Sequence, residues 1–294
     1  MISTTPKGAV IVNSFWRGGD EGASKIAREL TRLGAPTEVL RGLECRLSVG
    51  RGILGNVPFD FAVYLDKDDH LARLLEGKGV RLFNRAESIR LADDKMLTHI
   101  ALAPFVRQPE TIPSPLLFAG EDDPAFLARV EKELGYPVVV KKCFGAFGRE
   151  VKLARNEGEL SAIRASLLKE PHLYQKYIEC NASDLRIITI GGKAVAAMRR
   201  KATRPGEFRA NAELGGSGEK TEITPEIREV AECASRALGL EYAGVDLLWD
   251  EEGYLVTEVN SNAHFKLIEE VTGVPVASLY AEYILKEIKK GESL

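Results

Sequence analysis

Short apolar runs alternate with helical patterns through the first hundred residues of the chain. The runs "GAVIVN" (8–13), "FDFAVYLD" (59–66) and "VRLFN" (80–84) are typical of buried strands. Between them, "EGASKIARELTRLG" (21–34) and "HLARLLEGKG" (70–79) have the periodicity of amphipathic helices. Because strands that alternate with helices are joined by crossovers, the pattern predicts a parallel α/β unit.

A proline-rich passage follows this unit. The stretch "AESIRLADDKMLTHIAL" (86–102) predicts one longer helix, and several prolines then lie between Pro104 and Pro124. Proline fixes φ and lacks a backbone donor, so this passage cannot be helical throughout. We therefore predict a linker here, after an N-terminal unit that covers residues 1–103.

Two further units are predicted after the proline-rich passage. Strands at 136–143, 149–155 and 172–178, with a helix at 157–169, indicate a compact α+β block over residues 104–180. The last unit, 181–294, contains two strands around the Gly191–Gly192 turn, a glycine-rich loop, a helix, a hairpin and two amphipathic terminal helices. With 294 residues, the chain is long enough for two or three packed units.

Composition excludes several classes of protein. Hydrophobic residues make up 45% and charged residues 28% of the chain, which is typical of a soluble globular protein. The net charge is −3 and no block of Lys or Arg occurs, so a nucleic-acid partner is not expected. No run reaches the roughly 18 apolar residues of a membrane span, and we expect a cytoplasmic protein. The four cysteines are widely separated and predict neither a zinc site nor a disulfide framework.

The hairpin "VDLLWDEEGYLVTEVNSNAHF" (245–265) carries polar residues within otherwise apolar strands. Asp246, Glu258 and Asn260 flank a turn at Asp250–Gly253. One explanation is a solvated hairpin face, because residues two apart in a strand share a face. The other is a metal site. The hairpin by itself does not decide between them.

A strand, a lysine and a glycine turn occur together in "VVVKKCFGAFGREV". Gly145 and Gly148 would let backbone N–H groups approach phosphate oxygens, with Lys141 as a nearby cation. The common alternative is an ordinary hairpin loop with solvated lysines, and a solvated helical lysine is equally the alternative for Lys95. No G-x-x-x-x-G-K-[ST] loop is present and no helix follows the turn, which disfavours that class of nucleoside triphosphatase.

Arginines gather near the ends of the later strands. Arg186 follows Asp184 in one strand, Arg200 ends the next, and "GEFRAN" adds Arg209 and Asn211. Several guanidiniums at such positions can clamp anionic oxygens bidentately. Surface ion pairing with the many nearby acids is the alternative, and the clustering favours a functional role.

The order of these pieces resembles the ATP-grasp ligases, and within them the RimK-type branch, which joins amino acids such as glutamate to a carboxylate. The resemblance runs from about Asp93 to the C-terminus and more loosely over the N-terminal unit. It implies an α/β and α+β protein, in which an N-terminal parallel α/β domain precedes an ATP-grasp fold. The ATP-grasp fold would consist of a small subdomain with the glycine flap and a large subdomain with the metal site.

The resemblance also implies roles for individual residues. ATP and Mg²⁺, or Mn²⁺, are the expected cofactors, and hard oxygen ligands suit such a cation. The metal ligands would be Asp246, Glu258 and Asn260. Nucleotide contacts would come from Lys95, Lys141, the flap residues Gly145, Ala146, Phe147 and Gly148, the adenine hinge Gln175, Lys176, Tyr177 and Ile178, and Asp184. The positions near the γ-phosphate and the acyl intermediate would be Arg200, Arg209, Asn211 and Arg186.

The chain departs from the family pattern at a few positions. Glu150 stands where many RimK-type proteins have a third flap glycine, and Ala146 where serine or threonine is common. Lys176 stands where the hinge is frequently acidic, and "SNAHF" replaces the usual small residues and proline after Asn260. These changes leave the substrate open. His264 invites a role as general base, but we favour a polar cap for the helix that follows it.

The function implied is an ATP-dependent carboxylate–amine ligase that works through an acylphosphate. The carboxylate acceptor would be a small molecule or a peptide C-terminus, and the amine donor an amino acid such as glutamate. A kinase that uses the same site, and a nucleotide-binding regulatory or scaffold protein with a degenerate ATP-grasp fold, are the alternatives. Apolar faces on the terminal helices allow a homodimer or homotetramer, and no membrane partner is expected.

Overall fold

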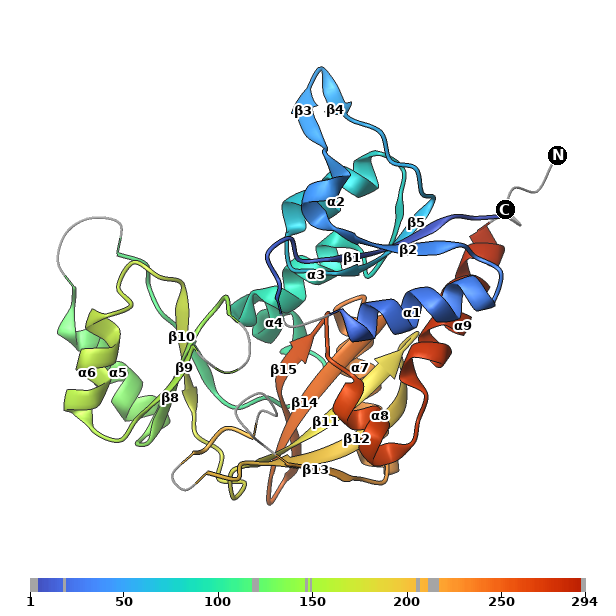
Figure 1. Cartoon of the computed structure of the whole chain (residues 1–294). Coiled ribbons are helices and arrows are strands. Elements are labelled where there is room, and N and C mark those ends of the chain that lie inside the picture. The colour runs from blue at the N-terminus through green and yellow to red at the C-terminus, as the bar shows by residue number, and fades with distance from the viewer. Residues whose placement is uncertain are drawn as a thin grey trace.

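The computed structural model describes residues 5–17, 20–117, 122–145, 148, 150–204, 207–210 and 217–291. Three sheets and a small hairpin organise this part of the chain (Figure 1). One sheet is parallel and belongs to the N-terminal third, and the other two are antiparallel. This agrees with the predicted fold class. Among the described residues, no helix combines the length and the apolar character needed to cross a bilayer.

The N-terminal sheet is parallel, in the order β2-β1-β5-β6. Alternate residues of its strands face two different cores, because successive side chains of a strand point to opposite faces. Helix α1 packs on one face, whereas α2 and α3 cover the other. The elements are β1 (Gly8–Val12), α1 (Glu21–Arg32), β2 (Thr37–Arg41), β5 (Phe61–Leu65), α2 (Asp69–Gly77), β6 (Arg81–Phe83) and α3 (Ala86–Asp93).

Some elements of this unit were not predicted from the sequence. Strand β2 is half-buried at the sheet edge, so it lacks the apolar run of an inner strand. A short helix η1 (Gly42–Cys45) and a hairpin of β3 (Ser48–Gly50) and β4 (Gly52–Leu54) follow it, and the hairpin projects from the domain in Figure 1.

The single helix predicted over 86–102 is wrong. The chain forms α3 and then α4 (Lys95–Leu102), because Asp94 between them is extended, with φ −85° and ψ 106°. The Asp94 carboxylate accepts hydrogen bonds from the backbone N–H groups of Met96 and Leu97. This is an N-cap, and it starts a new helix whose first residue is Lys95.

The small antiparallel sheet has the order β7-β10-β8-β9. Its β7 lies inside the passage predicted as a linker, and β10, which begins the strand predicted at 172–178, is an inner strand. Helices α5, which was not predicted, and α6 pack on one face of the sheet. The elements are β7 (Thr111–Pro113), α5 (Pro124–Leu134), β8 (Val138–Lys142), β9 (Val151–Ala154), α6 (Glu157–Ala165) and β10 (His172–Lys176).

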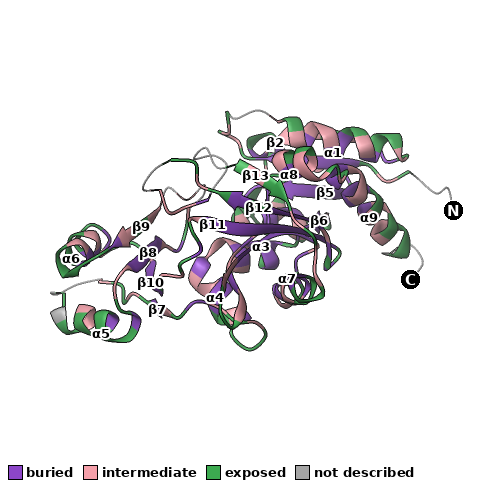
Figure 2. Ribbon diagram, turned by 90° about the horizontal axis from the view of Figure 1, so that it is seen from below, coloured by how far each residue is buried: buried purple, intermediate pink, exposed green. Residues whose placement is uncertain are grey.

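The large antiparallel sheet has the order β13-β12-β11-β14-β15. Helix α7 packs on one face, and α8 and α9 lie on the other, where Figure 2 shows buried residues along β11 and β12. The elements are β11 (Ser183–Ile190), β12 (Lys193–Lys201), β13 (Ser217–Lys220), α7 (Pro225–Ala237), β14 (Tyr242–Asp250), β15 (Gly253–Asn260), α8 (Lys266–Thr272) and α9 (Val276–Gly291).

One hydrophobic core joins the N-terminal unit to the large sheet. Val10 and Ile26 of the first unit share it with Met198, Tyr242 and residues of α9. Asn84 adds polar contacts across the same junction: its Nδ2 donates to the carbonyls of Tyr242 and Ser261 at 2.8 and 3.0 Å. The apolar face of α9 is therefore used within the chain. It no longer supports the dimer or tetramer inferred from it.

Candidate nucleotide and metal site

The β14–β15 hairpin brings the three predicted metal ligands together. Asp246 lies directly opposite Glu258 in the register, and Asn260 lies opposite Gly244 on the same side of the ladder. A bulge leaves Thr257 without a partner beside them. A Cβ at Gly244 would lie 2.5 Å from Ala263 Cβ, so this close approach requires glycine.

Lys95 and Lys141 approach this hairpin from two other elements. Lys95 Nζ lies 3.9 Å from Glu258 Oε1, and Lys141 Nζ donates to Thr257 Oγ1 at 3.0 Å. Both lysines are only 8% exposed, so the alternative of solvated lysines is wrong for each. Burial lowers the pKa of the Lys141 ammonium to about 8, although Glu258 opposes that shift. Buried ionisable groups with a shifted pKa that gather in this way are typical of functional sites.

Arginines and aspartates of β11, β12 and β14 form a buried ion cluster. Arg186 pairs through two nitrogens with Asp246, while Arg200 pairs bidentately with Asp184 at 2.7 Å and reaches Asp246 Oδ2 at 3.0 Å. All four residues are less than 10% exposed, so surface ion pairing does not describe them. Burial raises the pKa of Asp246, but Arg186 and Arg200 outweigh that effect and hold it below its ordinary value. Burial keeps the pKa of Asp184 raised despite Arg200.

Arg209 contacts the predicted flap. Its Nη1 donates to the carbonyl of Gly148 at 2.6 Å, and its guanidinium pairs with Glu207 at 2.7 Å. The Arg209 hydrogen bond lowers the pKa of the Glu207 carboxyl to about 2. Gly145 has φ 151°, and a Cβ there would lie 2.9 Å from Glu150 Cγ, which explains glycine at this position. The flap residues Ala146 and Phe147, and Asn211, lie outside the described residues.

The predicted adenine hinge begins inside β10. The Gln175 side chain is 2% exposed and points into the protein, where its Nε2 donates to Thr111 Oγ1 at 2.9 Å. Lys176 is exposed, whereas Tyr177 and Ile178 beyond the strand are half-buried. Any adenine contact here would therefore use the main chain of 176–178.

His99 and Gln108 form a buried polar network that was not predicted. His99 Nδ1 lies 2.5 Å from Gln108 Oε1, and its Nε2 lies 3.0 Å from Gln175 Nε2. Burial and the nearby Lys141 charge lower the pKa of His99 to about 4, so the ring is neutral at pH 7. The available signal was spacing, since His99 follows Lys95 by four residues and shares its face of α4.

His264 does not cap α8. Phe265 occupies the N-cap position without a side-chain hydrogen bond, so the favoured interpretation of His264 is wrong. The His264 ring instead packs edge-on against Trp16, with 5.9 Å between ring centroids. Its neighbour Asn262 donates to the carbonyl of Leu65 at 2.7 Å. The loop after Asn260 therefore contacts the carboxyl ends of the N-terminal strands.

The donor set of the hairpin suits a hard cation. Carboxylate and amide oxygens are the ligands that Mg²⁺ takes, and the Asn260 side chain makes no hydrogen bond to another described residue. The described residues contain no group of three His, Cys, Asp or Glu side chains placed for a metal, so the set reaches three ligands only with the Asn260 amide. Arg186 and Arg200 already donate to the Asp246 carboxylate, so Asp246 would bind the ion and the arginines together. With that sharing, the residues fit Mg²⁺.

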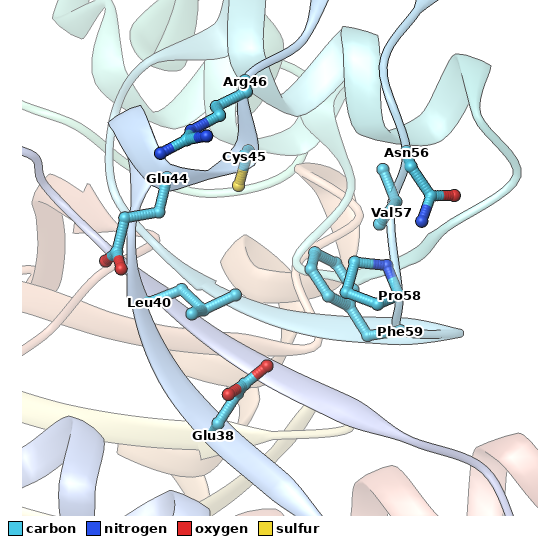
Figure 3. Close-up of a pocket in the computed structure, with 9 residues that line it drawn as sticks. All are labelled: Glu38, Leu40, Glu44, Cys45, Arg46, Asn56, Val57, Pro58 and Phe59. Carbon is cyan, nitrogen blue, oxygen red and sulfur yellow. The ribbon is translucent and has the colours of Figure 1, made fainter.

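A cavity of about 380 Å³ lies elsewhere, in the N-terminal unit (Figure 3). Its walls come from β2, η1 and the segment that leads to β5, and it contains none of the predicted site residues. It is lined by Glu38, Leu40, Glu44, Cys45, Arg46, Asn56, Val57, Pro58 and Phe59. The convergence of charged side chains around the β14–β15 hairpin therefore identifies the candidate site better than cavity volume does.

Comparison with known proteins agrees with this arrangement. Residues 92–284 match the family model of the RimK-like ATP-grasp domain, which is more than half of the chain. The chain is a RimK-like ATP-grasp protein. In this ATP-grasp protein the match begins just before Lys95 and includes all three predicted metal ligands.

Curated relatives of this ATP-grasp protein include named ligases. It is 37% identical over 230 residues to a probable alpha-L-glutamate ligase 2 of Shewanella amazonensis, covering 74% of this chain and 71% of the relative. It is 34% identical over 228 residues to human N-acetylaspartylglutamate synthase A, covering 76% of this chain. That match spans 57% of the human protein's length.

Solved structures resemble the whole ATP-grasp chain. The RimK domain protein from Sphaerobacter thermophilus gives a TM-score of 0.73 at 20% identity, covering 95% of this chain and 99% of that one. D-alanine–D-alanine ligase from Bacillus anthracis, complexed with ATP, gives 0.74 at 16% identity, covering 98% and 100%. At these identities the likeness establishes the fold, including the N-terminal α/β unit.

Proposed function

We propose that this protein is an ATP- and Mg²⁺-dependent carboxylate–amine ligase that adds an amino acid to a carboxylate acceptor through an acylphosphate. The observation that carries the proposal is the meeting of Asp246 and Glu258 across β14–β15 with Lys95 and Lys141 close by. Acidic oxygens for a cation and ammonium groups for phosphates are what phosphoryl transfer requires.

The first step transfers the γ-phosphoryl group of ATP. An oxygen of the acceptor carboxylate forms a bond to the γ-phosphorus, the bond to the bridging oxygen breaks, and ADP leaves. Lys95 and Lys141 would neutralise the phosphate oxygens, and Arg200 and Arg186 would hold Asp246 ionised beside them. A Mg²⁺ ion held by Asp246, Glu258 and Asn260 would supply further positive charge beside those oxygens.

The second step forms the amide. The amine nitrogen attacks the acyl carbon, the carbon–oxygen bond to phosphate breaks, and the nitrogen loses a proton. Arg209 would act here, and its hydrogen bond from the irregular segment 207–210 to the flap carbonyl of Gly148 supports this role. A flap held closed in this way would exclude the water that hydrolyses an acylphosphate.

Glutamate is our proposed amine donor. Several relatives are named as alpha-L-glutamate ligases or as synthases of N-acetylaspartylglutamate and beta-citrylglutamate. The names differ in the carboxylate that is joined, so the acceptor of this chain is proposed only as a class, a small-molecule or peptide carboxylate. The sequence departures at Glu150 and Lys176 leave the acceptor open. In the structure, Glu150 pairs with Lys142 at 3.4 Å, and Lys176 is exposed.

Product analysis tests this proposal. The protein is incubated with Mg-ATP, single amino acids and a panel of carboxylates that includes N-acetylaspartate, citrate and short peptides. ADP release is measured and the products are weighed by mass spectrometry. A mass gain of one amino-acid residue that depends on ATP is expected. A phosphorylated product without an amide would favour a kinase, and ATP binding without turnover would favour a regulatory protein.

A further inference from the structure

Lys67 is a lysine of the N-terminal unit that the predicted site does not include. It lies in the loop between β5 and α2, and its backbone N–H donates to Asp66 Oδ1 at 2.7 Å. Asn13 Nδ2 donates to the same oxygen at 3.0 Å, and Asp66 is 7% exposed. Two hydrogen bonds to one buried carboxylate fix the backbone from which the Lys67 side chain extends.

The Lys67 ammonium reaches the flap. Its Nζ donates to the carbonyl oxygen of Gly145 at 3.4 Å, and Lys95 Nζ donates to that same oxygen at 3.3 Å. Two lysines from separate elements thus meet at the first residue of the flap. A single carbonyl oxygen carries only a partial negative charge, so it cannot balance two ammonium groups at this separation.

Carboxylates pair with both lysines but leave ammonium donors over. Asp93 Oδ1 forms an ion pair with Lys67 Nζ at 2.6 Å, and an ammonium has three N–H donors, while Glu258 Oε1 lies 3.9 Å from Lys95 Nζ. Glu258 is also a proposed metal ligand, and Mg²⁺ would reduce what it offers to Lys95. An anion with several oxygens would satisfy both ammonium groups better than the flap carbonyl does.

We propose that Lys67 is a phosphate-binding residue that, together with Lys95, holds the phosphoryl group during and after its transfer from ATP. The N-terminal unit thereby supplies a cation to the reaction. The identity of the anion rests on the proposed function. Lys67 is 33% exposed at its side chain, so a phosphate oxygen can reach it.

A binding experiment tests Lys67 without knowledge of the acceptor. Orthophosphate is titrated calorimetrically into protein saturated with Mg-ADP. The resulting complex contains the two products, ADP and phosphate, that the two proposed steps generate from ATP. We compare wild type with Lys67→Gln, which removes the charge, and Lys67→Arg, which keeps it. Lys193→Gln is the matched control: Lys193 also pairs with a carboxylate, Glu232 at 3.1 Å, but lies at the β11–β12 turn.

The expected result is specific to phosphate. Lys67→Gln should weaken orthophosphate binding about tenfold or more and leave Mg-ADP affinity within about twofold. Lys67→Arg should recover most of the loss, and Lys193→Gln should change nothing. Unchanged phosphate affinity in Lys67→Gln, an equal loss of Mg-ADP affinity, or no phosphate binding by wild type would each overturn the proposal. A missing amide product would contradict the proposed function but leave this result standing.

A competing explanation makes Lys67 only a latch for the flap. A latch would hold Gly145 in place, and its loss would let water reach the site. The Lys67→Gln protein would then hydrolyse Mg-ATP and release ADP faster than wild type when no acceptor is present. It would bind orthophosphate as tightly as wild type. That combination of results would reject the phosphate-binding role.

Discussion

A buried ion pair of arginine and aspartate lies at each antiparallel sheet of this protein, and the two groups differ in what surrounds them. Beside the small sheet, Arg164 of α6 pairs with Asp122, donates to Ser114 and Tyr174 at 3.0 and 3.3 Å, and lies over the Phe126 ring. In the large sheet, Arg186 and Arg200 share Asp246 beside a second charged group formed by Glu258, Lys95 and Lys141.

The difference distinguishes an ion pair that we interpret as structural from one that we propose to be functional. Every partner of Arg164 comes from its own small unit, and Asp122 remains 31% exposed at its side chain. The Asp246 side chain is 4% exposed. The charged groups near it come from three places: Lys141 from β8 of the small sheet, Lys95 from α4, and Glu258 from the large sheet. A buried arginine is therefore weak evidence for a site. A cluster of several buried charged groups with shifted pKa values is stronger evidence, because such clusters are typical of functional sites.

Removing Glu258 should produce the largest effect. Glu258→Ala deletes a proposed metal ligand, and we expect ATP turnover to fall about a thousandfold or to disappear while the protein stays folded. ADP release and circular dichroism measure the two properties. Glu252→Ala is the control, because Glu252 lies in the same hairpin but is 80% exposed at its side chain. A folded Glu258→Ala protein with near-normal ADP release would sink the metal assignment.

Neutralising the aspartate of each ion pair tests the comparison of the two pairs directly. Asp246→Asn leaves two buried guanidiniums short of a carboxylate and should cost about 3 kcal/mol of unfolding free energy, with loss of ATP turnover. Asp122→Asn should cost about 1 kcal/mol, because Asp122 is partly solvated, and should leave turnover intact. Urea unfolding and ADP release separate the two variants. Equal losses of turnover would mean that both ion pairs serve the site.

The buried His99 should make stability depend on pH. Its folded pKa of about 4 lies below the ordinary value of 6.5, so the unfolded chain binds more protons between those values. Stability should therefore decrease as pH falls from 6.5 towards 4, by up to about 3 kcal/mol from this group. His99→Gln should be less sensitive to pH over that range in urea unfolding. Identical pH profiles for the variant and wild type would show that His99 does not titrate this way.

The buried Lys141 should produce the smallest effect, a pH dependence of ATP binding. With a pKa of about 8, its ammonium is present below that pH and lost above it. The Kd for ATP should therefore rise about tenfold between pH 7 and pH 9, because the neutral amine binds phosphate poorly. Lys141→Arg should bind ATP equally at both values, since guanidinium stays charged. A pH-independent Kd in wild type would contradict the assignment of Lys141 to the phosphates.

Much of the fold followed from local patterns. The parallel N-terminal strands, the β11–β12 pair around Gly191–Gly192 and the β14–β15 hairpin lie where apolar runs and turn glycines predict them. The misses were of another kind. Strand β2 is half-buried and β7 has three residues, so neither has an apolar run, and the break at Asp94 depends on one side chain that caps α4.

The sequence by itself determined the fold class, the family and the residue types at the site, because strand and helix periodicity and the order of the motifs are properties of the chain. Only the tertiary structure decided which charges are buried and which meet. Nothing in the local sequence distinguishes the buried Lys95, Lys141, Arg186 and Arg200 from lysines and arginines that are solvated. Lys67, His99 and Gln108 act through partners between 9 and 78 residues away, and such contacts exist only after the sheets have packed.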